Sequence, residues 1–121
     1  MLSDQQLLHY QTFGFVVLRQ LFTADELKRI NAEFIQAMEA AYQHMPFDGS
    51  TRHWVTMLGP TTPSCANLLE GPRLCSVAEQ LYGDDTLGLM ADANRYVGDT
   101  NWHPDTHSFH QFGVKFAFYL E

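Results

Sequence analysis

The longest regular pattern of hydrophobic and polar positions lies between residues 24 and 43. Six apolar residues recur there at spacings of three and four, which places them on one face of a helix. They are Leu27, Ile30, Phe34, Ala37, Met38 and Ala41. The preceding Thr23-Ala24-Asp25-Glu26 is a capping box, in which Thr23 accepts from the backbone of Glu26 and Glu26 reaches back. The pattern therefore predicts an amphipathic helix that runs from this cap to about Gln43.

Two shorter helices are predicted on either side of this one. Ser3 or Asp4 caps a first helix that stops at Gly14, since glycine accepts the left-handed backbone that often ends helices. Pro72 suits the first position of another helix, over Arg73 to Leu81, with Gly83 at its end. The front of the chain, about residues 1–83, is thus expected to be mainly helical.

Short apolar runs without helical spacing predict strands. They are Phe15 to Leu18, Leu87 to Met90, Asn94 to Val97, and Val114 to Leu120. In the last run, Lys115, Ala117 and Tyr119 fall on one side of a strand, and the apolar residues between and around them fall on the other. Lys115 is expected outside, where it would blunt a sheet edge. The alternative is a position inside a barrel, near an anionic co-substrate.

Residues 45–63 are broken by glycine and proline and predict a long loop. Such a loop is either a lid or substrate-facing segment, or a cover in which Trp54 fills a gap over the core. His53 would line the substrate mouth in the first case and lie at the surface in the second.

Composition excludes several classes of protein. The chain has 121 residues, enough for one domain, and its formal net charge of -7 with only seven scattered basic residues argues against a nucleic-acid partner. No apolar run approaches the ~20 residues that span a bilayer, and the N-terminus does not resemble a secretory signal. A cytoplasmic protein without nucleic-acid or membrane partners is expected. Cys65 and Cys75 match no metal or disulfide pattern and are expected as buried or half-buried thiols.

The run Trp102-His103-Pro104-Asp105 carries the most informative chemistry. A histidine and an aspartate two positions apart can point the same way from extended backbone. Together they supply two of the three ligands of the 2-His-1-carboxylate triad, which binds Fe(II) and leaves positions open for O2 and a co-substrate. The third ligand, a distal histidine, is expected well downstream.

Other interpretations of this region remain open. A lone H-x-D pair also occurs as a surface turn. His103, His107 and His110 together form H-P-D-T-H-x-x-H, which suggests zinc if they share a helix face. A turn into a strand is favoured instead, with His107 and His110 as loop or rim residues. Asp84, Asp85 and Asp92 are expected to form a solvated turn.

Longer stretches around these residues resemble a known family. Residues 94–105, NRYVGDTNWHPD, look like the proximal metal motif of the phytanoyl-CoA dioxygenase family. Residues 10–18, with Leu21-Phe22-Thr23 and Glu26-Leu27, are similar to that family's opening helix, strand and second helix. The closing Phe118-Tyr119-Leu120-Glu121 resembles the strand that follows its H-x-D. Residues 45–63 have no counterpart.

The resemblance implies an α+β fold in which N-terminal helices pack on part of a double-stranded β-helix, a jelly-roll or cupin-like core. Residues 1–121 would form one incomplete dioxygenase domain, with the β core beginning at about residue 84. It also implies Fe(II) and 2-oxoglutarate as cofactor and co-substrate, His103 and Asp105 as metal ligands, and hydroxylation of a small organic substrate. Asn94 is the candidate contact for the co-substrate.

In that family a distal histidine and an arginine for 2-oxoglutarate would follow Glu121, so the chain corresponds to the N-terminal portion and is expected to be inactive alone. Arg95 is a conceivable substitute for that arginine, although a solvent-facing strand position is favoured. A non-catalytic binding or interaction module derived from the same fold is the alternative. The apolar segment 114–120 further predicts self-association through an unpaired strand edge.

Overall fold

The protein is a small α+β structure. The computed structural model describes residues 1–83, 86–103, 105 and 113–120. Its elements are helices α1 (Asp4–Phe13) and α2 (Ala24–Ala41), strand β1 (His53–Thr56), helices α3 (Pro63–Glu70) and α4 (Pro72–Tyr82), and strand β2 (Asp92–Arg95). The α+β class is confirmed. Over the described ranges the sheet has two strands, and no double-stranded β-helix is formed.

Helix α2 forms as its sequence pattern predicts. The Glu26 backbone N–H donates to Thr23 Oγ1 at 3.3 Å, and the Thr23 N–H donates to Glu26 Oε2 at 2.7 Å, which completes the capping box. Ile30 and Met38 on the apolar face are buried. The helix ends at Ala41, two residues before the predicted end.

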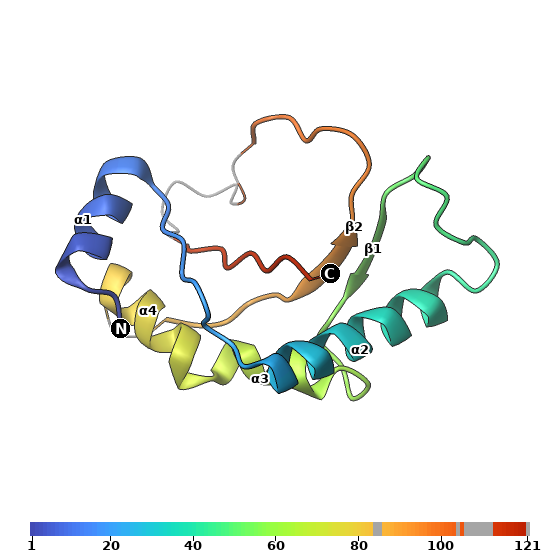
Figure 1. Ribbon diagram of the computed structural model, residues 1–121, viewed down its shortest axis with the longest axis horizontal. Coiled ribbons are helices and arrows are strands. Elements are labelled where there is room, and N and C mark those ends of the chain that lie inside the picture. The colour runs from blue at the N-terminus through green and yellow to red at the C-terminus, as the bar shows by residue number, and fades with distance from the viewer. Residues whose placement is uncertain (84–85, 104, 106–112, 121) are drawn as a thin grey trace.

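Helices α1 and α4 also match their predictions, and they contact each other. The Leu2 N–H donates to Gln80 Oε1 at 2.6 Å, and Gln80 Nε2 donates back to the Leu2 carbonyl at 2.9 Å. The hydroxyls of Tyr10 and Tyr82 lie 2.8 Å apart at the other end of the contact. The N-terminus is thereby attached to α4, and Figure 1 shows α1 and α4 together at one end of the molecule.

The sheet consists of β1 and β2 paired antiparallel, with His53 opposite Arg95 and Thr56 opposite Asp92. The Met57 N–H extends the pairing by donating to the Ala91 carbonyl at 2.8 Å. His53 and Met57 are buried while Trp54 and Thr56 are exposed, which is the alternation expected of a strand with one covered face. The covered face packs on α2, and the other face carries Trp54 together with the polar Thr56, Asp92 and Asn94.

The prediction of a continuous loop over residues 45–63 is wrong, because β1 lies inside it. Helix α3, which begins at Pro63, the last residue of this range, was not predicted at all. Both elements are short, so their local signals are weak, and they form because β2 and α2 lie beside them. Trp54 is 55% exposed on the outer face of β1 and does not fill a gap over the core.

The prediction that His53 lines a mouth or lies at the surface is also wrong. Its side chain is 2% exposed and stacks on the Tyr42 ring, with 3.7 Å between the ring centroids. Strand alternation turns His53 toward the end of α2, where Tyr42 is located. The Tyr42 hydroxyl secures this contact, because it accepts from the Trp54 N–H at 3.0 Å and donates to the Trp54 carbonyl at 3.1 Å.

Three predicted strands are not formed. Residues 15–18, 87–90 and 114–120 have no ladder partner among the described residues, and β2 begins two residues earlier than predicted. In the second of these segments Gly88 passes against α3 so closely that a Cβ there would lie 2.7 Å from Leu69 Cβ. A strand requires a neighbour to accept its backbone hydrogen bonds, and an apolar run alone does not provide one.

The core lies where α2, α3 and the sheet meet. Buried Ile30, Met57 and Cys65 come from these three elements, and Leu120 from the C-terminal segment packs against them. Burying a side chain such as Ile30 contributes about 1.5–3 kcal/mol. Cys65 is buried and Cys75 half-buried, and both are free thiols, as predicted. Burial, aided by Glu33, raises the pKa of Cys65 to about 12, so this thiol stays protonated and unreactive.

Glu33 on α2 caps helix α3 from outside. Its Oε1 accepts from the Ser64 N–H at 2.8 Å and its Oε2 from the Cys65 N–H at 3.0 Å. These are amides of the first turn, which have no partner within the helix. The partial burial of Glu33 opposes its ionisation, but the hydrogen bonds from Ser64 and Cys65 together outweigh this effect and lower the pKa.

We therefore expect Glu33→Ala to reduce the free energy of unfolding by about 1–2 kcal/mol, the usual cost of losing a helix cap. Urea denaturation at neutral pH measures it, with Glu39→Ala, an exposed position on the same helix, as the control. Because the folded pKa of Glu33 is lowered, its contribution is present above the unfolded pKa of about 4.5. It is lost as the pH falls through the folded value, so the two proteins should converge in acid. An equal loss in both variants would contradict the capping role.

Candidate metal site

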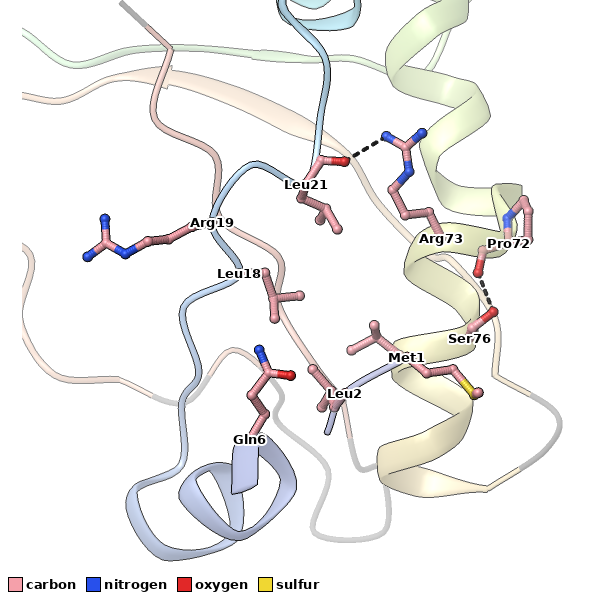
Figure 2. A pocket seen from close by; sticks show the side chains of 10 residues that line it. Met1, Leu2, Gln6, Leu18, Arg19, Leu21, Pro72, Arg73 and Ser76 are labelled. Atoms are coloured by element: carbon pink, nitrogen blue, oxygen red, sulfur yellow. Dashed lines mark hydrogen bonds between the residues drawn. The ribbon is translucent and has the colours of Figure 1, made fainter. Parts of the chain in front are cut away.

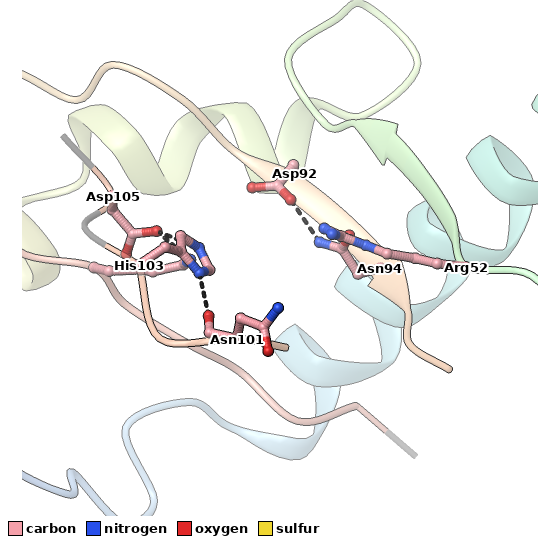
Figure 3. Close-up of polar contacts among 7 residues, drawn as sticks. Arg52, Asp92, Asn94, Asn101, His103 and Asp105 are labelled. Atoms are coloured by element: carbon pink, nitrogen blue, oxygen red, sulfur yellow. Dashed lines mark hydrogen bonds and ion pairs between the residues drawn. The ribbon is translucent and has the colours of Figure 1, made fainter. Parts of the chain in front are cut away.

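The candidate ligands lie on the loop that follows β2. Gly98 has a φ of 68°, a left-handed conformation that glycine accepts readily, and turns the chain away from the sheet. Beyond it, His103 Nε2 lies 3.6 Å from Asp105 Oδ1 (Figure 3). Since metal–ligand bonds to nitrogen or oxygen are about 2.1 Å long, two donors at this separation can share one ion. The structure thus brings the two predicted ligands together.

The orientation of the His103 ring is set by the backbone. Its Nδ1 lies 2.6 Å from the Asn101 carbonyl oxygen, which can only accept, so Nδ1 carries a proton. In the neutral imidazole, Nε2 then has the free lone pair, and Nε2 is the atom that faces Asp105. Metal-binding histidines are commonly oriented in this way by a carbonyl or carboxylate on the other nitrogen.

Lys115 joins the pair from the C-terminal segment. Its Nζ donates to Asp105 Oδ1 at 3.2 Å, which forms the His103–Asp105–Lys115 cluster. The side chains of all three residues are more than half exposed. Lys115 is exposed, as predicted, but its ammonium group contacts Asp105 and does not merely face solvent at an edge.

The donor set fits Fe(II) chemically but supplies two ligands. Imidazole and carboxylate suit this ion, and a third protein ligand on the same face completes the usual site. Within the described part of the chain, no group of three histidine, cysteine, aspartate or glutamate side chains is arranged to bind a metal. His107 and His110, like Pro104, Asp84 and Asp85, lie outside the described residues.

Asn94, the candidate contact for the co-substrate, lies on β2 within a polar network. Its Oδ1 accepts from Arg52 Nε at 2.9 Å, and its Nδ2 donates to Asp92 Oδ2 at 2.5 Å (Figure 3). The Arg52 guanidinium also lies 4.5 Å from the centroid of the Tyr96 ring. Asp92 therefore begins strand β2 and accepts a hydrogen bond from the Asn94 side chain. This differs from the solvated turn that was predicted for it.

Arg95 faces the opposite side of β2. Its guanidinium lies 5.4 Å from the centroid of the Phe34 ring and 5.8 Å from that of Phe47. It is half-buried against these aromatic rings, so the solvent-facing position favoured for it is wrong. Alternation along the strand explains this, because Arg95 shares the covered face with Ala93 while Asn94 is on the other face.

A pocket of about 210 Å³ lies elsewhere, between the N-terminus, residues 18–21 and the start of α4 (Figure 2). Two arginines line it, but Arg73 is already engaged. It donates to the Leu21 carbonyl at 3.0 Å and to Glu26 Oε1 at 2.9 Å. The bond from Arg73, with those from Thr23, lowers the pKa of Glu26 to about 2. This pocket therefore lies between α1, residues 18–21 and α4, and its Arg73 also contacts α2 through Glu26.

Sequence reasoning missed two residues of the site region. Asn101 acts through its carbonyl oxygen, which no side-chain pattern reveals, although its place two residues before His103 is a usable signal. Arg52 lies 42 residues from Asn94 and meets it through the pairing of β1 with β2. Only the strand register could have identified it.

Comparisons of the chain with protein-family models, curated proteins and solved structures find no match. In the residues that the structure describes, no helix has both the length and the apolar character needed to cross a membrane.

Proposed function

We propose that this chain carries the iron-binding segment of a non-haem Fe(II)/2-oxoglutarate-dependent oxygenase similar to the phytanoyl-CoA dioxygenase family. The observation that supports it most directly is the orientation of His103. Its Nδ1 bonds the Asn101 carbonyl, and its Nε2 faces Asp105 Oδ1 at 3.6 Å. Metal-binding histidines almost always donate their other ring N–H to a carbonyl or carboxylate, whereas a surface H-x-D turn has no need of this bond.

In this proposal His103 and Asp105 hold the metal, and a third ligand comes from outside the described residues. Fe(II) in such a site, with 2-oxoglutarate and O2, supplies the oxidising chemistry that hydroxylates a small organic substrate. Asn94 is the proposed contact for the co-substrate. Arg52, which binds the Asn94 side chain, would place a positive charge beside the co-substrate carboxylates.

The proposed fold of the intact domain is a double-stranded β-helix, with β1 and β2 as two of its strands. Two features support this. The outer face of the pair carries the polar network of Asp92, Asn94 and Arg52 beside the exposed Trp54. In residues 114–117, Lys115 and Ala117 are exposed while Val114 and Phe116 are half-buried, an alternation suited to a strand, although Phe118 beyond them is exposed.

A second candidate function, a non-catalytic interaction module, is favoured by the apolar surface. Trp102 and Tyr119 are almost fully exposed, and Leu87, Leu89 and Met90 are each more than two-thirds exposed. Large apolar side chains exposed to this degree are typical of surfaces that contact another molecule when they lie together. Binding of a metal at His103 and Asp105 would distinguish the oxygenase from this alternative.

The metal assignment is tested by titrating the chain with Fe(II) under argon, or with Co(II). We expect weak binding that falls at least about tenfold in His103→Ala and in Asp105→Ala, since even outer-shell partners cost that much. His44→Ala and Asp99→Ala, both exposed, are matched controls and should bind as the parent does. Tight binding that survives His103→Ala would instead favour the zinc interpretation through His107 and His110.

Turnover is tested separately. With Fe(II), ascorbate and 2-oxoglutarate, the 121-residue chain should form no succinate above a control without protein. The physical reason is that two ligands hold Fe(II) weakly, and Arg95 packs on Phe34 and does not reach toward the site. Succinate formation that Asp105→Ala abolishes would contradict this, and would mean that the site is completed within this chain or by a second copy.

We also expect self-association through residues 114–120. Among the described residues, no backbone hydrogen bond joins this apolar segment to another element, and a segment of this composition can pair with a second copy. Light scattering at micromolar concentration should give a dimer or larger. Ala117→Pro, which removes one backbone donor, should shift the chain toward monomer, whereas Ala117→Ser should not. A clean 13.8 kDa monomer of the parent chain would contradict the expectation.

A further inference from the structure

The same carboxylate oxygen of Asp105 contacts both His103 and Lys115. Oδ1 lies 3.6 Å from His103 Nε2 and 3.2 Å from Lys115 Nζ. A cation held between His103 and Asp105 would use the oxygen nearest to Nε2, and this is the oxygen to which the Lys115 ammonium donates. The lysine and the cation therefore require the same atom.

We propose that Lys115 competes with the metal for Asp105, so that binding of a divalent cation requires the ammonium group to leave Oδ1. The inference rests on the proposed function, because it takes His103 and Asp105 as metal ligands. It adds a role for Lys115 that metal ligation does not itself imply: Lys115 sets how tightly the pair binds a cation.

The placement of Lys115 suits a displaceable group. Its side chain is 62% exposed and reaches Asp105 across ten residues of chain, so the ammonium can move into solvent on its flexible stem. The half-buried Val114 and Phe116 on either side hold the backbone in place. The contact is thus local and reversible, and releasing it does not disturb the core.

The size of the effect follows from the exposure of the pair. Exposed ion pairs are weak, and water and salt screen the repulsion between an ammonium group and a nearby dication. Removing the lysine charge should tighten metal binding by ~3- to 10-fold. The effect should shrink as ionic strength rises, because the interaction that opposes the metal is electrostatic.

The test is a calorimetric titration of the full chain with Co(II), comparing the parent with Lys115→Met and Lys115→Arg. Lys115→Met should bind ~3- to 10-fold more tightly at low salt and lose most of this advantage in 0.5 M salt, where the screening length is only a few ångströms. Lys115→Arg keeps the charge and should resemble the parent. Lys28→Met, which removes the only other lysine, an exposed residue on α2, controls for net charge and should not change the affinity.

Unchanged or weaker binding by Lys115→Met would overturn the competition, and weaker binding would show that Lys115 positions Asp105 for the metal. The same gain in Lys28→Met would overturn it too, because net charge would then be the cause. Failure of the proposed function is recognised separately, since His103→Ala and Asp105→Ala would then bind as the parent does. Absence of binding in both the parent and Lys115→Met would reject both proposals.

Discussion

The packing of α2 against the sheet and α3 is the constraint on which the rest of the structure depends. One face of this helix supplies Ile30 to the core, where it meets Met57 from the end of β1 and Cys65 from α3. The adjacent Glu33 accepts hydrogen bonds from the first turn of α3. A single helix therefore covers the sheet and caps its neighbour. Short elements such as β1 and α3 are stable because they are held against it.

This packing also determines where the candidate site forms. Pairing of β2 with β1 fixes the point at which the chain leaves the sheet, and the Gly98 turn directs it toward Asn101 and His103. Leu120 packs against the same core and so holds the C-terminal segment beside it. Lys115 is five residues before that anchor, which explains how an exposed lysine reaches the Asp105 carboxylate.

The site itself is open to solvent, and this governs its energetics. His103, Asp105 and Lys115 have side chains that are more than half exposed, so each pairwise interaction is weak and depends on salt. In the proposed site, a second cation near Asp105 would change the affinity for a metal without a large effect on folding. The polar network around Asn94 lies on the uncovered face of the sheet, the face available to a ligand.

Local sequence determined helices α1, α2 and α4 and the H-x-D pair, but not helix α3. The capping box at Thr23 and the apolar spacing of α2 depend on contacts within a few residues, so they could be predicted. The same holds for the glycines that end α1 and α4. The H-x-D pair is equally local, since two residues on extended backbone can face the same way, and the structure places His103 and Asp105 together. In the apolar run 114–120, Lys115 is exposed as predicted and Val114, Phe116 and Leu120 on the other side are half-buried, but Phe118 on that side is exposed.

Tertiary structure decided the strands, the place of His53 and the partner of Asp105. A strand exists only where a neighbour accepts its hydrogen bonds, so residues 15–18 and 87–90 form none, while His53–Thr56 becomes β1 because Asp92–Arg95 lies beside it. His53 is buried because that pairing turns it onto Tyr42. Arg52 reaches Asn94 across 42 residues and Lys115 reaches Asp105 across ten. These contacts depend on how the chain returns on itself, which no local pattern of residues specifies.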